Sequence, residues 1–248
     1  MNQLPWSGMT FQDALQYFQV KVEQGLSRDE AADKLRRNGP NLLAEKQKAS
    51  LILLFCYQFR DFMVIVLLGA TLLSGLLGEY TDALVIIGIV IVNAVLGFVQ
   101  EYRAERSLEA LKELTAPMAR VVRDGSRLEL PAEKLVPGDI VLIEAGDRIP
   151  ADIRLGEVRQ LSVNEASLTG ESEPISKQVE APGCLGSSLG DRVNMLFMGT
   201  MAVGGRASGV VVATGMQTEM GRVAHLIQER GKKQLRCKSA LSKWVDCW

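Results

Sequence analysis

The residues Leu168 to Ser172 read Leu-Thr-Gly-Glu-Ser, and this stretch holds the groups best suited to chemistry. Gly170 allows a tight turn, because glycine adopts backbone conformations that other residues avoid. Such a turn would present the carboxylate of Glu171 beside the hydroxyls of Thr169 and Ser172. A carboxylate placed in this way can orient a water molecule against a phosphate and act as a general base. The alternative, from these residues alone, is an exposed acidic loop between two strands.

The composition and charge of the chain limit the classes of binding partner and site that it can have. The chain has 248 residues, of which 47% are hydrophobic, and its 28 basic and 29 acidic residues give a net charge of -1. This length suits one or two domains, and the balanced charge gives no reason to expect nucleic acid as a partner. The cysteines lack the spacing of a zinc site, a redox pair or a disulfide framework, so we predict reduced thiols and no metal or cofactor site in this chain. They are Cys56, Cys184, Cys237 and Cys247.

The first 50 residues are predicted to form a cytosolic helical module. The pairs Thr10-x-x-Asp13 and Ser27-x-x-Glu30 have the spacing of capping boxes, and each opens an apolar run of helical period. An Asn-Gly-Pro sequence at 38–40 ends the second helix, since proline cannot continue it. The first ten residues lack the pattern of a signal peptide. We expect this module to pack or dock, without chemistry of its own.

Residues 51–117 are predicted to form a transmembrane hairpin followed by a stalk. The uncharged blocks at about 62–78 and 83–100 have lengths close to that of a bilayer span, and a short acidic linker joins them. Basic residues flank the outer ends of this pair, so both ends should be cytosolic. A charged helix with a narrow apolar stripe continues the second block as the stalk. We therefore expect a multi-pass membrane protein in the lipid bilayer, with its N-terminus in the cytosol.

Residues 118–228 are predicted to form a cytosolic all-β domain. Short β-branched or alternating runs separated by glycine, proline and aspartate indicate strands at 119–122, 127–130, 140–143, 153–155, 161–163 and 210–213. An Asp124-Gly125 turn separates the first two runs. Aspartates in the turn-rich phrases are interpreted as turn formers that bond nearby backbone amides. The predicted fold class is a multidomain α+β membrane protein with a helical module, a two-helix hairpin with a stalk, and a β-rich domain.

Several ordered motifs resemble those of P-type cation-transporting ATPases. A single motif of this kind is weak evidence, but an ordered set after a membrane hairpin is specific. The resemblance extends from Gly25 to Gly221 and is strongest to the calcium pumps of the reticulum and secretory-pathway type. The motifs are Pro137-Gly138-Asp139, Gly146-Asp147-x-x-Pro150-Ala151-Asp152, Ser167-Leu168-Thr169-Gly170-Glu171-Ser172, Phe197-x-Gly199-Thr200 and Thr214-Gly215-x-x-Thr218-Glu219-x-Gly221.

The resemblance implies roles for the residues of the Thr-Gly-Glu-Ser sequence. In such pumps ATP phosphorylates an aspartate elsewhere in the chain, and a β-rich actuator domain, here residues 118–228, brings this loop to the aspartyl phosphate. Glu171 would orient and help deprotonate the attacking water, while Thr169, Gly170 and Ser172 would shape the loop beside the phosphate. ATP and Mg²⁺ are implied for the complete pump. The implied partner is the remainder of the pump, with its phosphorylation domain and later helices.

The sequence also departs from the family pattern. It contains no Asp-Lys-Thr-Gly-Thr phosphorylation sequence, nucleotide-binding domain or later helices, so we expect an N-terminal fragment that is inactive alone. Residues 229–248 form a basic tail unlike the rest. Permitted codons for Lys233 to Trp248, read in another frame, give a segment that resembles the one after the actuator domain. We interpret the tail as a frameshift product, with a natural terminus or an unrelated tail as the alternative.

Two other functions are compatible with these residues. One is a membrane-anchored module that binds or regulates an intact pump through its β-rich domain. The other is a two-span membrane protein whose β-rich domain is purely structural. The two predicted spans offer isolated oxygen ligands rather than the cluster that a hard cation requires, so a transported ion would bind elsewhere.

Overall fold

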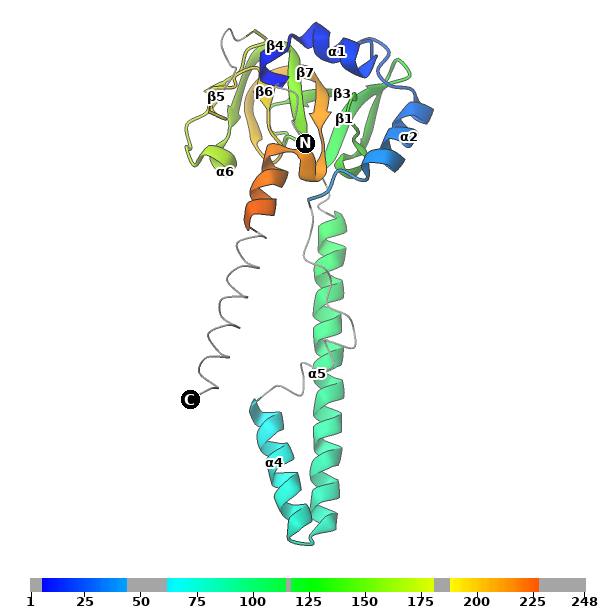
Figure 1. Ribbon diagram of the computed structural model, residues 1–248, viewed down its shortest axis with the longest axis vertical. Helices are drawn as coiled ribbons and strands as arrows, with labels where there is room; N and C mark the ends of the chain where they lie inside the picture. Colours follow the sequence, from blue (N-terminus) through cyan, green and yellow to red (C-terminus); the bar gives the residue numbers. More distant parts are fainter. Residues whose placement is uncertain (1–5, 44–61, 115–116, 181–187, 228–248) are drawn as a thin grey trace, which may run out of the picture. The chain divides into compact units, whose positions relative to one another are not determined.

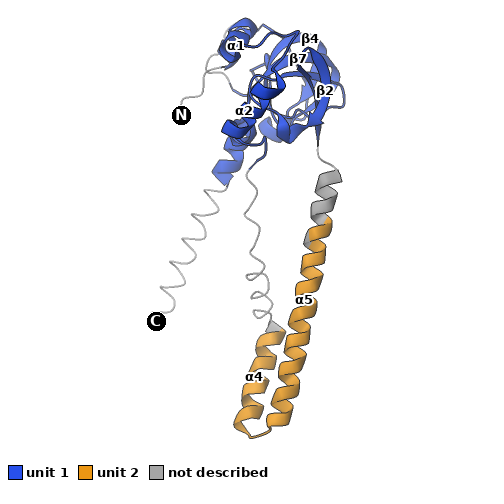
Figure 2. Ribbon diagram, turned by 90° about the vertical axis from the view of Figure 1, so that its right-hand side faces the viewer, with its two compact units in different colours: residues 1–44, 117–248 blue, residues 45–116 orange. Residues whose placement is uncertain are grey.

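The computed structural model describes residues 6–43, 62–114, 117–180 and 188–227. The chain forms two compact units, one made by residues 1–44 and 117–248 and the other by residues 45–116 (Figure 2). The N-terminal helices and the β-strands therefore belong to the same unit, although the second unit separates them in the sequence. The tail at 229–248 lies outside the described residues, so its interpretation as a frameshift product stays a prediction.

The first unit begins with a 3-10 turn, η1 (Trp6–Gly8), and the helices α1 (Phe11–Phe18) and α2 (Arg28–Asn38). Both predicted capping boxes are confirmed. The hydroxyls of Thr10 and Ser27 each accept a hydrogen bond from the backbone N–H three residues later, and the carboxylate there accepts one in return. These contacts satisfy N–H groups that the start of a helix leaves free. The predicted end of the second helix is also confirmed, since Gly39 follows α2 with a φ of 75°.

A seven-stranded antiparallel sheet forms the body of this unit (Figure 1). The strand order is β2-β1-β3-β7-β4-β5, and β6 pairs with β4. Asp124 and Gly125 have φ values of 50° and 69° in the turn between β1 and β2, which confirms the predicted tight turn. The strands are β1 (Met118–Arg123), β2 (Ser126–Pro131), β3 (Ile140–Glu144), β4 (Asp152–Asn164), β5 (Ile175–Ser176), β6 (Met195–Leu196) and β7 (Met201–Ala213). The 3-10 turns η2 (Ala132–Lys134) and η3 (Gly215–Gln217) follow β2 and β7.

The long strand β4 contains two of the predicted strands. The runs at 153–155 and 161–163 were expected to be separate, and this expectation is wrong. The pairing of β4 with β7 shifts register between Leu155 and Glu157 and again between Arg159 and Ser162. Gln160, inside the second irregularity, has a φ of 52°. Because bulges bend a strand and interrupt its alternation, one long strand gives the sequence pattern of two short ones.

Two apolar clusters hold the first unit together. One joins residues of β1, β3, β4 and β7, including the fully buried Ile153 and Leu155. The other joins the N-terminal segment to the sheet and contains Ala14 and Phe197. Leu168 packs against this second cluster, so the candidate loop begins from a packed residue. The helices therefore cover apolar sheet residues that would otherwise face water.

In the described residues, the second unit consists of the helices α4 (Phe62–Leu76) and α5 (Tyr80–Leu114). A short turn joins them, and Gly78 in this turn has a φ of 83°. The segment Tyr80–Ala104 of α5 is long and apolar enough to cross a membrane, with a mean hydropathy of 2.5, whereas Met63–Leu76 is a shorter apolar helix. One described helix thus meets the requirements of a span. The two-span hairpin and the multi-pass topology stay predictions.

Candidate functional site

The Thr169–Ser172 loop lies at an edge of the sheet. After β4 the chain makes one helical turn, α6 (Ala166–Thr169), and then returns along β5. Val163 pairs with Ile175, so the pairing of β4 with β5 holds the two ends of the segment between them side by side. β5 is the last strand in the sheet order, and the loop beside it lies at the periphery of the unit (Figure 1). Loops placed by a rigid scaffold are common sites of binding and catalysis.

Local hydrogen bonds fix the backbone of this loop. The hydroxyl of Thr169 donates to the carbonyl of Glu165 at 3.1 Å and accepts from the N–H of Glu171 at 3.3 Å. Gly170 ends α6 with a φ of 81°, and its N–H donates to the carbonyl of Ala166. A Cβ at Gly170 would meet nothing within 4 Å, so the requirement for glycine is conformational rather than steric. The predicted tight turn at Gly170 is therefore confirmed.

The tip of the loop carries the exposed groups. The side chains of Glu171 and Ser172 are exposed, whereas Thr169 is half-buried. Within the described residues, no donor pairs with the Glu171 carboxylate, and Ser172 is held through its carbonyl, which accepts from Asn164 Nδ2 at 3.4 Å. The structure thus brings the four predicted residues together in one turn. An exposed carboxylate with unused lone pairs is able to accept a hydrogen bond from water.

The base of the loop contains a buried ion pair that the sequence analysis missed. Lys177 Nζ lies 2.5 Å from Glu165 Oε1, and the two side chains are 0% and 1% exposed. Burial raises the pKa of Glu165 and lowers the pKa of Lys177, and the partner charge opposes both shifts. Nζ also lies 5.6 Å from the centre of the Phe197 ring. One feature of the sequence could have indicated this pair: Glu165 directly precedes α6, and Lys177 directly follows β5.

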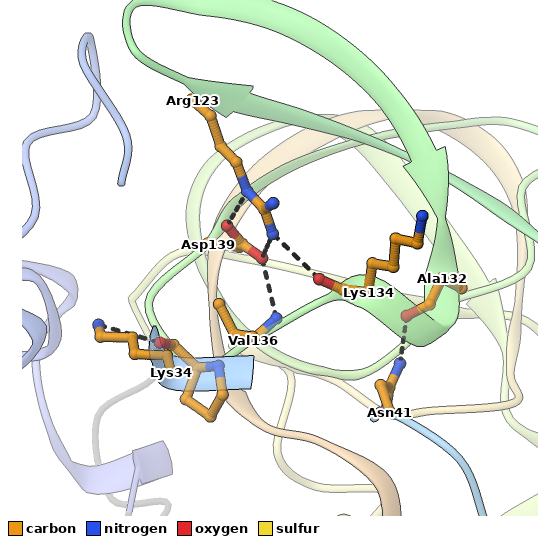
Figure 3. Close-up of polar contacts among 8 residues, drawn as sticks. Lys34, Asn41, Arg123, Ala132, Lys134, Val136 and Asp139 are labelled. Carbon is orange, nitrogen blue, oxygen red and sulfur yellow. Dashed lines mark hydrogen bonds and ion pairs between the residues drawn. The ribbon is translucent and has the colours of Figure 1, made fainter. Parts of the chain in front are cut away.

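The aspartates of two turn motifs hold the fold together. Asp139 accepts hydrogen bonds from Arg123 at 2.7 and 2.8 Å and from the N–H of Val136 at 2.9 Å (Figure 3). Asp147 accepts from the N–H of Glu144 at 2.8 Å and pairs with Arg120. In both motifs the amide lies three residues before the aspartate, which confirms the interpretation of these residues as turn formers.

For Asp152 the interpretation as a turn former is wrong, because the amides that it binds are distant in the sequence. Its carboxylate accepts from the N–H of Met198 at 2.9 Å and from the N–H of Glu219 at 2.8 Å. Burial raises the pKa of Asp152 to about 7, although the two amide hydrogen bonds act in the opposite direction. Residues 219–227 are helical, so Asp152 connects the first residue of that helix to the sheet.

Asn41 connects Ala132 to two of the ordered motifs. Its side-chain amide donates to the carbonyl of Ala132 at 2.9 Å, a contact drawn in Figure 3, and to the carbonyl of Pro150 at 2.8 Å. Its Oδ1 accepts from the N–H of Gly215 at 2.7 Å. Through Asn41 and Asp152, the motifs at 146–152, 197–200 and 214–221 are therefore connected in the first unit. Among the described residues, no group of three His, Cys, Asp or Glu side chains is placed to hold a metal ion.

Comparisons with known proteins assign this arrangement to a family. The P-type ATPase actuator domain model matches residues 113–228, and the model of the cation transporter/ATPase N-terminus matches residues 6–74. A calcium-transporting ATPase of Bacillus subtilis is 51% identical over 88% of this chain and 25% of its own length. A probable cation-transporting ATPase F of Mycobacterium tuberculosis is 46% identical over 82% of this chain and 22% of its own length.

A more distant relative matches over a similar range. The rat calcium-transporting ATPase type 2C member 2 is 38% identical over 91% of this chain and 24% of its own length. The chain thus spans about a quarter of the length of the curated relatives it matches. It belongs to the P-type cation-transporting ATPase family and corresponds to the N-terminal portion of such a pump.

Proposed function

We propose that this chain supplies the actuator part of a cation pump, and that its Thr169–Ser172 loop directs water onto an aspartyl phosphate. The observation that carries this proposal is the contrast within the loop. Its backbone is fixed by Thr169 and Gly170, while the carboxylate of Glu171 is exposed and unpaired within the described residues. Calcium is the proposed ion, because several relatives are named calcium-transporting ATPases.

In the proposed reaction Glu171 acts as the general base. A water oxygen forms a bond to phosphorus, the bond between phosphorus and the aspartyl oxygen breaks, and the water proton moves to the Glu171 carboxylate. Thr169 and Gly170 contribute by holding the turn, since the Thr169 hydroxyl already bonds within the loop. Ser172 is exposed, as is Glu171. ATP and Mg²⁺ serve the phosphorylation step in the complete pump, so this chain alone is inactive.

The helices α4 and α5 are proposed to lie in the bilayer. Large apolar side chains on both are exposed, including Leu72 at 68%, Leu76 at 78% and Leu84 at 73%. Lipid or the later helices of the pump would cover these side chains, since exposed apolar patches of this kind mark membrane or protein contacts. The N-terminus and the sheet would then lie in the cytosol, and the remainder of the pump would be the partner of this chain.

The test combines this chain with the remainder of a calcium pump, expressed as a separate chain from the Bacillus subtilis relative. We expect the phosphoenzyme to form on the second chain and to decay rapidly when the first chain is present. Glu171→Gln should slow this decay by at least about 100-fold, the effect of losing a positioned general base. Glu173→Gln is the matched control, because Glu173 is also exposed and lies two residues away.

Two results would contradict the proposal. Equal decay rates for the wild-type chain and Glu171→Gln would remove the catalytic role of this carboxylate and favour a purely structural domain. Phosphate release from ATP by the purified chain alone, abolished in Glu171→Gln, would show that the chain is not inactive by itself. Purified wild-type chain is expected to release no phosphate above the background of a detergent blank.

A further inference from the structure

The buried pair of Glu165 and Lys177 closes the candidate loop at its base. Glu165 directly precedes α6, and Lys177 directly follows β5, so every residue of the loop lies between them. Both side chains are almost completely buried, and their charged atoms lie 2.5 Å apart. The Oε2 atom of Glu165 has no hydrogen-bond partner among the described residues. The fold therefore holds two charges away from water, with one oxygen left unpaired.

Stability alone gives a poor reason for such a pair. The cost of removing two charges from water commonly equals or exceeds their attraction, and apolar residues of similar size often serve as well. The surroundings here are suitable for apolar replacements, because Phe197 lies against the ammonium and Leu168 packs nearby in the same cluster. A role beyond burial energy is therefore needed to account for the pair.

Each partner is connected to a different part of the scaffold. The N–H of Lys177 donates to the carbonyl of Leu161 on β4 at 2.9 Å, and its Nζ lies 3.5 Å from the carbonyl of Arg192. The carbonyl of Glu165 accepts from the N–H of Thr169 at 3.0 Å and from its hydroxyl at 3.1 Å. Lys177 is thus fixed on the sheet, while Glu165 fixes the residue that begins the turn.

A continuous series of contacts leads from this pair to the tip. The hydroxyl that bonds the Glu165 carbonyl also accepts from the N–H of Glu171 at 3.3 Å. The position of Glu165 therefore determines the position of Thr169, and Thr169 determines where the backbone of Glu171 lies. Without Lys177, the buried Glu165 carboxylate would move toward water or take up a proton, because an unpaired buried charge is strongly unfavourable.

We propose that Glu165 and Lys177 are positioning residues, and that their ion pair holds the loop in the one conformation that presents Glu171. Neither group touches the phosphate or the attacking water. This inference rests on the proposed function of the loop. If the pair served only the stability of the sheet, removing both charges together would restore stability and loop order at the same time.

The first test measures backbone hydrogen exchange in the full chain in detergent. The variants are Lys177→Met and the double variant Glu165→Gln with Lys177→Met, which leaves no charge behind. We expect the amides of residues 166–176, except Pro174, which has no N–H, to exchange at least about tenfold faster in both variants, because the loop opens locally. Core amides of β3 and β7 should exchange faster in the single variant and return to wild-type rates in the double variant. The double variant keeps the test valid if the single variant fails to fold.

The control uses the exposed pair of Glu157 and Arg159, which lies on the same strand β4. Its side chains are 59% and 61% exposed and make an ion pair at 2.7 Å. The double variant Glu157→Gln with Arg159→Met should leave the exchange of amides 166–176 unchanged. Wild-type loop exchange in the Glu165→Gln/Lys177→Met variant would overturn the inference, whatever the activity of the loop.

The second test uses phosphoenzyme decay in the combined pump. We expect the Glu165→Gln/Lys177→Met variant, although restored in core stability, to slow decay by at least about tenfold, a tenfold rate change being about 1.4 kcal/mol. Normal decay in this variant would overturn the positioning role. If Glu171→Gln itself has no effect on decay, the proposed function fails, and the exchange result still decides whether the pair orders the loop.

Discussion

The carboxylate of Asp139, in a turn motif, and the carboxylate of Glu171, in the candidate loop, lie in opposite environments. Asp139 is fully buried and accepts hydrogen bonds from Arg123 and from the N–H of Val136. Glu171 is exposed and has no partner within the described ranges of the chain. Both residues belong to short motifs that contain glycine, so motif composition does not distinguish them. Their hydrogen-bond partners distinguish them. A carboxylate whose lone pairs are occupied by protein donors stabilises the fold, whereas one with free lone pairs can bind water.

The largest effect on stability is expected at Asp139. Asp139→Ala leaves the 12%-exposed Arg123 guanidinium without its partner and removes the acceptor of the Val136 N–H. We expect the free energy of unfolding to fall by about 3–5 kcal/mol, as for other broken buried pairs. Urea denaturation of the full chain in detergent measures this change.

Glu157→Ala is the control for Asp139→Ala. It breaks the exposed pair with Arg159 and should cost at most about 1 kcal/mol. Equal losses in the two variants would mean that burial does not decide the structural value of a carboxylate here. The comparison between buried and exposed carboxylates would then fail at its first step.

The next effect concerns pH and Asp152. Its pKa in the folded chain is about 7, raised from 3.8 mainly by burial, so the folded state binds more protons than the unfolded state between these values. Stability should therefore be highest below about pH 4 as far as this group is concerned, and should fall as the pH rises through 7. The full loss is on the order of 4 kcal/mol.

Denaturation of the wild-type chain and of Asp152→Asn between pH 5 and 8 tests this effect. The asparagine does not titrate, and its Oδ1 can still accept from one of the two amides that Asp152 binds. The wild-type free energy of unfolding should therefore fall more steeply with pH than that of the variant. Parallel profiles would show that Asp152 keeps its charge throughout, held by its two amide hydrogen bonds.

These examples also show which features the sequence could predict. The capping boxes at Thr10 and Ser27, the Asp124-Gly125 turn and the glycine turn at 170 depend on residues within a few positions, and all were predicted. Long-range contacts were missed, because no local pattern indicates that the Gly215 N–H will reach Asn41, 174 positions away. The Glu165–Lys177 pair was missed for a related reason: both charges are ordinary in type, and burial alone gives them importance.

A smaller effect is expected for Gly170→Ala. The φ of 81° strains any residue with a Cβ, but the added atom would meet nothing within 4 Å, so the cost should be about 1–2 kcal/mol. Gly146→Ala is the control, because Gly146 also has a positive φ, 93°, and an added Cβ there would meet nothing within 4 Å. Both variants should lose similar stability in urea denaturation, and only Gly170→Ala should slow phosphoenzyme decay. Slowed decay in both would mean that general destabilisation, rather than the loop, limits the reaction.

The smallest effect on stability is expected at Glu171 itself. Glu171→Gln removes a charge that has no partner in the described part of the chain and that is already in water. The free energy of unfolding should therefore change by less than about 0.5 kcal/mol, the usual range for exposed substitutions. Urea denaturation of the variant and of Glu173→Gln should give superimposable curves. A loss as large as that of Asp139→Ala would mean that Glu171 has a structural partner. It would then be a fold-holding carboxylate like the aspartates, and the argument for its reaction with water would lose its basis.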